Sequence, residues 1–158
     1  MEVIGPGPVW HMIGHVQTNK AKYIPGFFTF LHSVDRWELL EALDRFGREL
    51  SVLFEVNIAG EVQKQGTTAA GLKSMLNRIG ELRCLKPVGL MTMPPYSEDP
   101  EQSRPFFRAL RELLAEVNRE FGLSLRELSM GMSSDFEVAV EEGATMVRVG
   151  TAIFGERS

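Results

Sequence analysis

The 158-residue sequence has a single cysteine, no excess of positive charge and no long hydrophobic run. The lone cysteine, Cys84, excludes an internal disulfide and a zinc site built from several cysteines, which fits a reducing cytoplasm. The net charge of −4 gives no general attraction to nucleic acid. No run of about 18 apolar residues occurs, and no basic segment followed by an apolar one opens the chain. We therefore expect no nucleic-acid partner, no membrane span and no secretion signal.

Short apolar runs alternate with helical patterns along the whole chain. Such alternation is typical of βαβ units, which form a parallel sheet with the helices outside. A complete eight-stranded barrel usually needs about 200–250 residues, so this chain is short by roughly two βα units. An open doubly wound sheet and a barrel both remain possible on the pattern alone. The runs predict strands at 9–16, 27–34, 51–60, 84–93, 127–132 and 146–154, and helices at 17–26, 35–50, 72–79, 106–121 and 135–142.

One arginine, Arg148, lies inside the last apolar run. Alternation places Met146, Arg148 and Gly150 on one face of the predicted strand. A parallel sheet covered by helices is buried on both faces, and a buried guanidinium without a partner costs several kcal/mol. Arg148 therefore requires an ion pair, for which Glu55 is a candidate, or else carbonyl groups, a polar cavity or a ligand.

Two turns next to Arg148 have the features of an anion site. Gly150 and Thr151 follow the arginine directly, and a glycine lets a ligand approach the backbone closely. Ser134 and Glu137 match the S-x-x-E capping box, which predicts that Ser134 caps the following helix. The same strand-to-helix turn presents free backbone N–H groups to an anion. The residues alone thus indicate an anion site of low specificity.

Several longer segments carry a resemblance to a known family. Their sequence resembles the pyridoxal phosphate homeostasis proteins, whose fold is similar to the N-terminal barrel of alanine racemase. The match runs over nearly the whole chain, and its C-terminal block is the most specific part. The matching segments are "WHMIGHVQTNK" (10–20), "HSVDR" (32–36), "GLMTMPP" (89–95), "LSMGMSSDFEVAVEEGATMVRVGTAIFGER" (128–157), and Lys64 with Gly66 after "FEVNIAGE".

The resemblance implies pyridoxal 5′-phosphate (PLP) as the cofactor and assigns roles to individual residues. Ser133, Gly150 and Thr151 match the positions that hold the phosphate, and Arg148 matches the arginine that faces the pyridine nitrogen. An arginine keeps its proton, so it favours an unprotonated ring nitrogen, which is a poor electron sink. Four further residues complete the expected cofactor site: Met132, Ser134, His11 and Lys64.

Two of these residues have simpler interpretations. A histidine on a strand, such as His11, is more often a core residue with satisfied hydrogen bonds. Lys64 lies in a polar loop, where a solvated charge is the ordinary interpretation. Both interpretations remain open.

The same resemblance predicts an incomplete barrel. The chain is similar to strands three to eight of the eight, and the first strand, which carries the Schiff-base lysine in the family, would lie upstream. We therefore expect one truncated barrel domain over 1–158, with PLP bound non-covalently or weakly. Six strands leave two open edges, through which copies of the chain are expected to self-associate.

The expected function is that of a cytoplasmic PLP-binding protein of vitamin B6 homeostasis, a carrier or regulator without its own turnover, and not an enzyme. One alternative is a fragment or relative of a PLP-dependent amino-acid racemase. Racemisation in that fold needs a tyrosine from a second domain, and the only tyrosines here are Tyr23 and Tyr96. A second alternative is a barrel that binds a phosphate compound other than PLP, although such a barrel has no need of Arg148.

Overall fold

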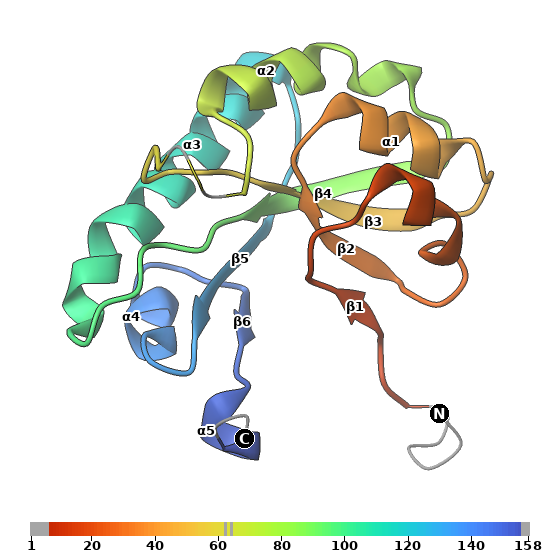
Figure 1. The fold of residues 1–158 in the computed structure, drawn as a ribbon. Helices are drawn as coiled ribbons and strands as arrows, with labels where there is room; N and C mark the ends of the chain where they lie inside the picture. The colour runs from red at the N-terminus through yellow and green to blue at the C-terminus, as the bar shows by residue number, and fades with distance from the viewer. Residues whose placement is uncertain (1–6, 62, 64, 156–158) are drawn as a thin grey trace.

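The computed structural model describes residues 7–61, 63 and 65–155. These residues form one sheet of six parallel strands. The strands lie in the sheet in the same order as in the sequence, from β1 to β6. The sheet curls into an arch, with β1 and β6 at its two open edges (Figure 1). We call this curled sheet the half-barrel. The strands are β1 His11–Met12, β2 Phe30–Val34, β3 Leu50–Glu55, β4 Leu85–Met91, β5 Glu127–Met132 and β6 Met146–Arg148.

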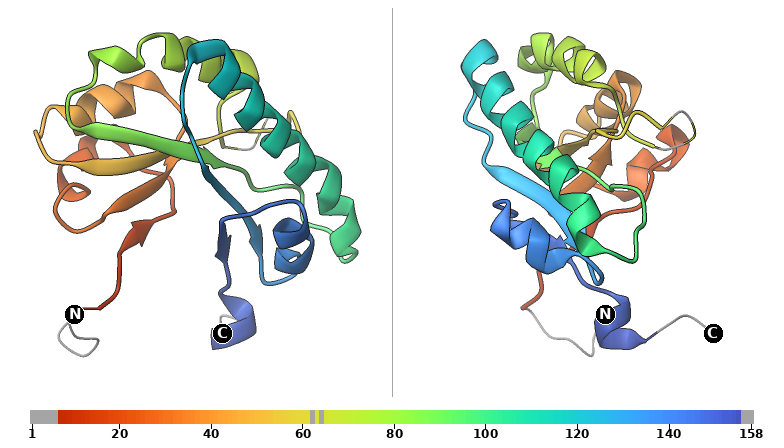
Figure 2. Two further views of the ribbon diagram at one scale, coloured as in Figure 1. Left: turned by 180° about the vertical axis from the view of Figure 1, so that it is seen from behind. Right: turned by 90° about the vertical axis from the view of Figure 1, so that its left-hand side faces the viewer.

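Helices follow the strands and cover the convex side of the arch (Figures 1 and 2). This arrangement is the one predicted from the alternating pattern. The α-helices are α1 Trp37–Asp44, α2 Ala69–Asn77, α3 Arg104–Phe121, α4 Phe136–Glu141 and α5 Thr151–Phe154, and the 3₁₀ helices are η1 Thr18–Tyr23, η2 Ile79–Glu81 and η3 Pro100–Ser103.

The main hydrophobic core lies between the strands and these helices. Helix α3 illustrates why, since its buried residues Phe107, Leu110, Leu114 and Val117 recur at the spacing of one helical face. The helix ends at Gly122, whose φ of 63° is a left-handed conformation that glycine adopts without strain. Apolar residues of the strands that point outward complete this core: Leu31, Val52, Phe54, Leu90, Leu128 and Met130.

The last apolar run departs from its prediction. A strand was expected over 146–154, but β6 ends at Arg148 and residues Thr151–Phe154 form the helix α5. The carbonyl of Gly150 accepts the N–H groups of Ile153 and Phe154, which closes this helical turn. Nor is β6 buried on both faces, because Val147 is 39% exposed at the open edge of the sheet.

Two further predictions need correction. The first strand is only two residues long, whereas 9–16 was expected. Ser134 does not cap α4, because the residue at the N-cap is Asp135. Asp135 is buried and its carboxylate accepts hydrogen bonds from the Met132 N–H at 2.7 Å and the Ser103 hydroxyl at 2.8 Å. The turn after β5 is thus fixed by Asp135 rather than by a capping box.

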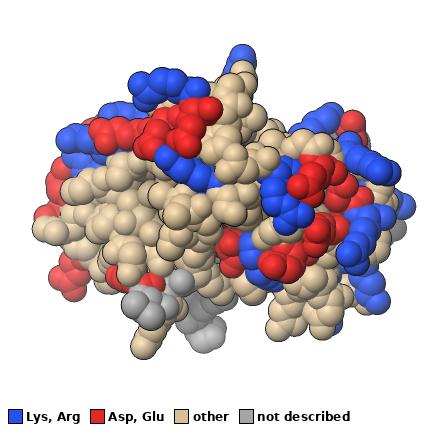
Figure 3. Space-filling view, turned by 90° about the horizontal axis from the view of Figure 1, so that it is seen from above, with Lys and Arg blue, Asp and Glu red and all other residues tan. Residues whose placement is uncertain are grey.

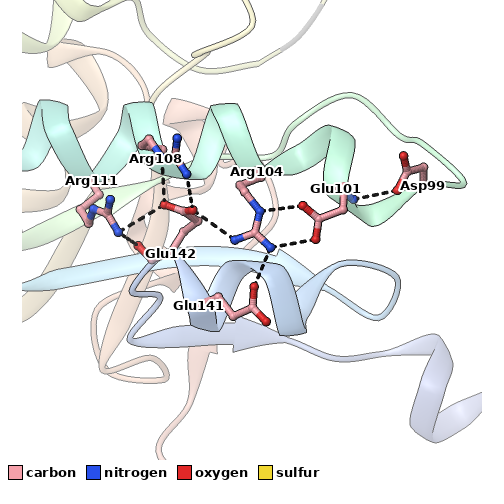
Figure 4. Close-up of polar contacts among 7 residues, drawn as sticks. All are labelled: Asp99, Glu101, Arg104, Arg108, Arg111, Glu141 and Glu142. Atoms are coloured by element: carbon pink, nitrogen blue, oxygen red, sulfur yellow. Dashed lines mark hydrogen bonds and ion pairs between the residues drawn. The ribbon is translucent and has the colours of Figure 1, made fainter.

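A network of charged side chains joins α3 to the end of α4 (Figure 4). The buried carboxylate of Glu142 lies 3.2 Å from Arg104, 2.9 Å from Arg108 and 3.3 Å from Arg111. Hydrogen bonding to Arg108 is the largest factor that lowers the pKa of Glu142. Because α4 directly follows the turn after β5, this network also fixes the position of that turn.

The surface shows no field of a single sign on the face drawn in Figure 3, where acidic and basic side chains are interspersed. Among the described helices, none has the length and apolar character needed to cross a bilayer.

Candidate cofactor-binding site

A chain of hydrogen bonds crosses the concave side of the half-barrel. The ring atom Nδ1 of His11 lies 2.8 Å from Nε2 of His32, and Nδ1 of His32 lies 2.8 Å from the Ser129 hydroxyl. The guanidinium of Arg148 donates to the same hydroxyl at 2.7 Å. These four residues come from β1, β2, β5 and β6, and strands β2 and β5 are not neighbours in the sheet. The curl of the sheet is therefore tight enough for side chains to meet across it.

The donors and acceptors of this chain run in one direction. Arg148 can only donate, so Ser129 accepts from it and has one proton left to give. Ser129 is fully buried, and His32 Nδ1 is the acceptor within reach. His32 then carries its proton on Nε2 and donates to His11. Burial, together with the nearby His11 and Arg148, lowers the pKa of His32 to about 4, which agrees with a neutral ring.

Arg148 is held in place by uncharged groups. Besides the Ser129 hydroxyl, its guanidinium donates to the backbone carbonyl of Thr92 at 3.0 Å. No ion pair joins it to Glu55, so this candidate partner from the sequence is not the one used. Burial lowers the pKa of Arg148, while the charges of Glu55 and Asp135 act in the opposite direction. Its charge thus remains available to a ligand.

The turns after β5 and β6 meet at Ser133. Its hydroxyl oxygen accepts hydrogen bonds from the N–H groups of Gly150 at 3.1 Å and Ala152 at 3.2 Å. Two backbone donors therefore converge beside a side-chain hydroxyl. Gly131 lets the end of β5 approach α4 closely, because its φ is 93° and a Cβ there would lie 2.6 Å from the Cβ of Ala139 on α4. Because the Ser133 oxygen accepts both N–H groups, its own proton is free to donate, and a hydroxyl donor at a turn of this kind suits a phosphate group.

Three connected cavities surround Arg148 and this cluster. The first, of about 460 Å³, is lined by Tyr96, Met132, Ser133, Ser134, Arg148, Gly150 and Thr151. The second, of about 520 Å³, shares Arg148 and Gly150 with the first and reaches His11, His32 and the edge strand β6. The third, of about 390 Å³, shares Tyr96 and Met132 with the first and is lined also by Glu55. We call them the phosphate cavity, the histidine cavity and the glutamate cavity.

Most residues that the sequence suggested for the site lie together. The phosphate cavity contains Arg148, Ser133, Gly150, Thr151, Met132 and Ser134. His11 lines the adjacent histidine cavity while it is bonded to His32, so it is both a satisfied interior residue and part of the cavity wall. Lys64 lies outside the described residues.

Five other residues belong to the site although the sequence did not predict them as cofactor-binding residues. Strand alternation could have placed Ser129 on the same side as Arg148, but no sequence signal links either residue to the distant His32. The two loop residues among them, Thr92 and Tyr96, depend on the path that the chain takes after β4. The five are His32, Thr92, Ser129, Tyr96 and Glu55. In the part of the chain that the structure describes, no cluster of three or more metal-binding side chains occurs.

Comparison with known proteins places this chain in a family. The family model "Alanine racemase, N-terminal domain" matches residues 6–158. The pyridoxal phosphate homeostasis protein of Aquifex aeolicus is 51% identical over 152 residues, which cover 94% of this chain and 67% of that protein. The protein of the same name from Synechocystis is 40% identical and is covered over 70% of its length. The chain thus spans about two thirds of the length of these relatives.

Solved structures of related proteins have the same fold as this chain. PipY of Synechococcus elongatus, determined with PLP bound, superposes with a TM-score of 0.87 at 37% identity, over 96% of this chain and 72% of PipY. Alanine racemase from Corynebacterium glutamicum is similar in fold, with a TM-score of 0.76 at 16% identity over 99% of this chain and 44% of the racemase. The chain therefore belongs to the alanine racemase N-terminal domain family and, within it, to the pyridoxal phosphate homeostasis proteins.

Proposed function

We propose that this chain binds PLP in the phosphate cavity and serves cofactor homeostasis as a carrier or regulator. The observation that carries the proposal is the meeting of Ser133 with the N–H groups of Gly150 and Ala152, next to the half-buried Arg148. The hydroxyl proton of Ser133, which these two hydrogen bonds leave free, suits the phosphate, and Arg148 suits the ring nitrogen. The related PipY, whose structure contains PLP, supports the choice of ligand.

The proposed assignment extends to the residues around this cluster. Ser133, Gly150 and Thr151 would hold the phosphate, Arg148 would face the ring nitrogen, and Met132 and Ser134 would line the phosphate cavity. His11 would contribute through the histidine cavity. Lys64 is proposed only from the family resemblance, since it lies outside the described residues.

The chemistry of Arg148 favours a role without turnover. Bound PLP can act as an electron sink, and that ability is greatest when its ring nitrogen is protonated. Arginine is always a donor in proteins, so it leaves the ring nitrogen as an acceptor. One observation supports the racemase alternative: Tyr96, a tyrosine of the kind that racemisation requires, lines the phosphate cavity. Tyr96 is 80% exposed, however, and an exposed phenol is poorly placed to hold a proton at a defined atom. A racemisation assay with L-alanine and PLP should therefore give no D-alanine.

Binding is proposed to be non-covalent in these cavities. None of the described residues that line the three cavities is a lysine. Borohydride reduction followed by peptide mapping should accordingly leave no strand lysine fully pyridoxylated.

The phosphate gives the sharpest test of the site. We expect PLP to bind at least about tenfold more tightly than pyridoxal, because charge-assisted hydrogen bonds to the phosphate would be lost with pyridoxal. Ser133→Asp should remove this preference by placing an acid beside the phosphate, while its carboxylate can still accept the N–H groups of Gly150 and Ala152. Calorimetric titration with both ligands measures the effect.

A matched control is Ser124→Asp, which makes the same charge change at an exposed position in the turn between α3 and β5. It should bind both ligands as the unchanged chain does. Equal affinities for PLP and pyridoxal in the unchanged chain, or unaltered PLP binding by Ser133→Asp, would overturn the proposal.

We also propose that residues 1–158 form one domain whose six strands correspond to strands three to eight of an eight-stranded barrel. Two observations support this correspondence: the sheet has open edges at β1 and β6, and the chain spans about two thirds of its relatives. Self-association through these edges follows from the proposal and is tested below.

A further inference from the structure

The glutamate cavity contains a carboxyl group that no other part of the site accounts for. Glu55 is the last residue of β3, and its side chain is almost fully buried, at 2% exposure. Its Oε2 atom is enclosed and finds no hydrogen-bond partner within the described ranges. Buried polar groups are nearly always paired, and Glu55 lines the cavity, so its unpaired carboxyl oxygen points to a group that enters the cavity and pairs with this side chain.

The charges around Glu55 define what that group must be. Burial and the nearby Asp35 raise the pKa of Glu55 to about 7, and the charge of Arg148 offsets only part of this effect. The carboxylate form therefore lacks stabilisation in the protein itself. A positively charged hydrogen-bond donor would supply it, whereas an anion or a neutral acceptor would not.

The remaining walls of the cavity favour an alkyl chain attached to that charge. Met93, Pro94 and Met132 give an apolar lining, and Met132 and Met93 are partly exposed toward the opening. Gln63 and Gln65 add side-chain amides at the exposed rim. Among the described lining residues, none is a cation that could pair with the carboxylate of an α-amino acid.

We propose that the glutamate cavity binds an alkylammonium group, either the side chain of a lysine or a free alkylamine, with the ammonium at Glu55 and the methylene groups against Met93 and Met132. Through Tyr96 and Met132 this cavity adjoins the phosphate cavity. The biological role of this cavity rests on the proposed function, because a carrier of PLP would pass the cofactor to an amine that lies beside its aldehyde.

Binding of amines without an aldehyde present tests the cavity directly. The probes are n-butylammonium, Nα-acetyl-lysine N-methylamide, L-alanine and n-butanol, each titrated by NMR into the chain alone and with 4-deoxypyridoxine 5′-phosphate, which has no aldehyde. We expect the two alkylammonium probes to bind and L-alanine and n-butanol to bind at least about tenfold more weakly. If both alkylammonium probes bind, the cavity can accommodate a lysine side chain of a peptide. If only n-butylammonium binds, the ligand is a free alkylamine.

Glu55→Gln keeps the shape of the side chain and removes its charge, so it should fold and lose alkylammonium binding by about tenfold or more. Glu112→Gln, on the exposed face of α3, is the matched control and should change nothing. Equal binding of n-butanol and n-butylammonium, or full binding by Glu55→Gln, overturns the inference. If 4-deoxypyridoxine 5′-phosphate and PLP bind but the amines do not, the inference is wrong and the proposed function stands. If the amines bind but neither phosphate compound does, the proposed function is wrong and the amine site stands.

Discussion

His32 connects the two ends of the hydrogen-bond chain inside the half-barrel, and its protonation state decides whether the chain can form. A protonated ring would have donors at both nitrogens, so it could not accept the proton of the Ser129 hydroxyl. It would also add a positive charge close to Arg148. The fold therefore holds His32 neutral, and through Ser129 it orients the guanidinium that the proposed cofactor site needs.

This requirement makes stability depend on pH. The pKa of His32 is 6.5 as a reference and about 4 in the folded chain, so between these values the unfolded chain binds more protons. As the pH rises from about 4 to 6.5, His32 should thus add up to roughly 3 kcal/mol to the free energy of unfolding, whereas Glu55, whose folded pKa is raised to about 7, should lower it over an overlapping range. His32→Gln, which does not titrate, should remove the His32 contribution, so the free energy of unfolding of this variant should rise less, or fall more, with pH over this range than that of the unchanged chain. Urea unfolding at a series of pH values measures it, and equal slopes for both proteins would contradict the account.

At the scale of elements, most of the fold could be predicted and the site only in part. Helix α3 and strand β5 follow directly from hydrophobic periodicity, which is a local property of the sequence. The end of β6 was missed because Gly150 and its hydrogen bonds to α5 outweigh the β-branched character of the run. The contact of His32 with Ser129 depends on how far six strands curl, which no single segment encodes.

The junction of α3 and α4 gives a prediction at this scale. Glu142→Gln removes the negative charge that three arginines share, and it leaves Arg104, Arg108 and Arg111 close together. We expect the thermal midpoint to fall by roughly 5 °C. The neighbouring Glu141→Gln is the matched control, since Glu141 is exposed and contacts only Arg104 in this network, so its midpoint should hardly change. A scanning calorimeter measures both, and equal midpoints for the two variants would show that the network does not fix α4.

The molecule as a whole has a curled sheet whose two edge strands are both open. Among the described residues, β1 and β6 each pair with a single strand, and the histidine cavity extends between them, from His11 and Ile13 to Val147. Ile13 and Val147 are each 39% exposed. Apolar edge strands with unpaired backbone groups are templates for further pairing, and natural sheets commonly protect such edges with charged residues.

We therefore expect the chain to self-associate in solution as its concentration rises. Val147→Lys places a charge on the β6 edge and should shift the population toward monomer, because a lysine in a paired edge would have to lose its hydration. Val140→Lys is the matched control: Val140 is 56% exposed and belongs to the helix α4 rather than to an edge strand, so the substitution should leave pairing of the edges unchanged. Size-exclusion chromatography with light scattering over about a hundredfold range of concentration measures the effect. A monomer at every concentration would mean that the edges are protected in another way, and equal association of the two variants would place the contact elsewhere on the surface.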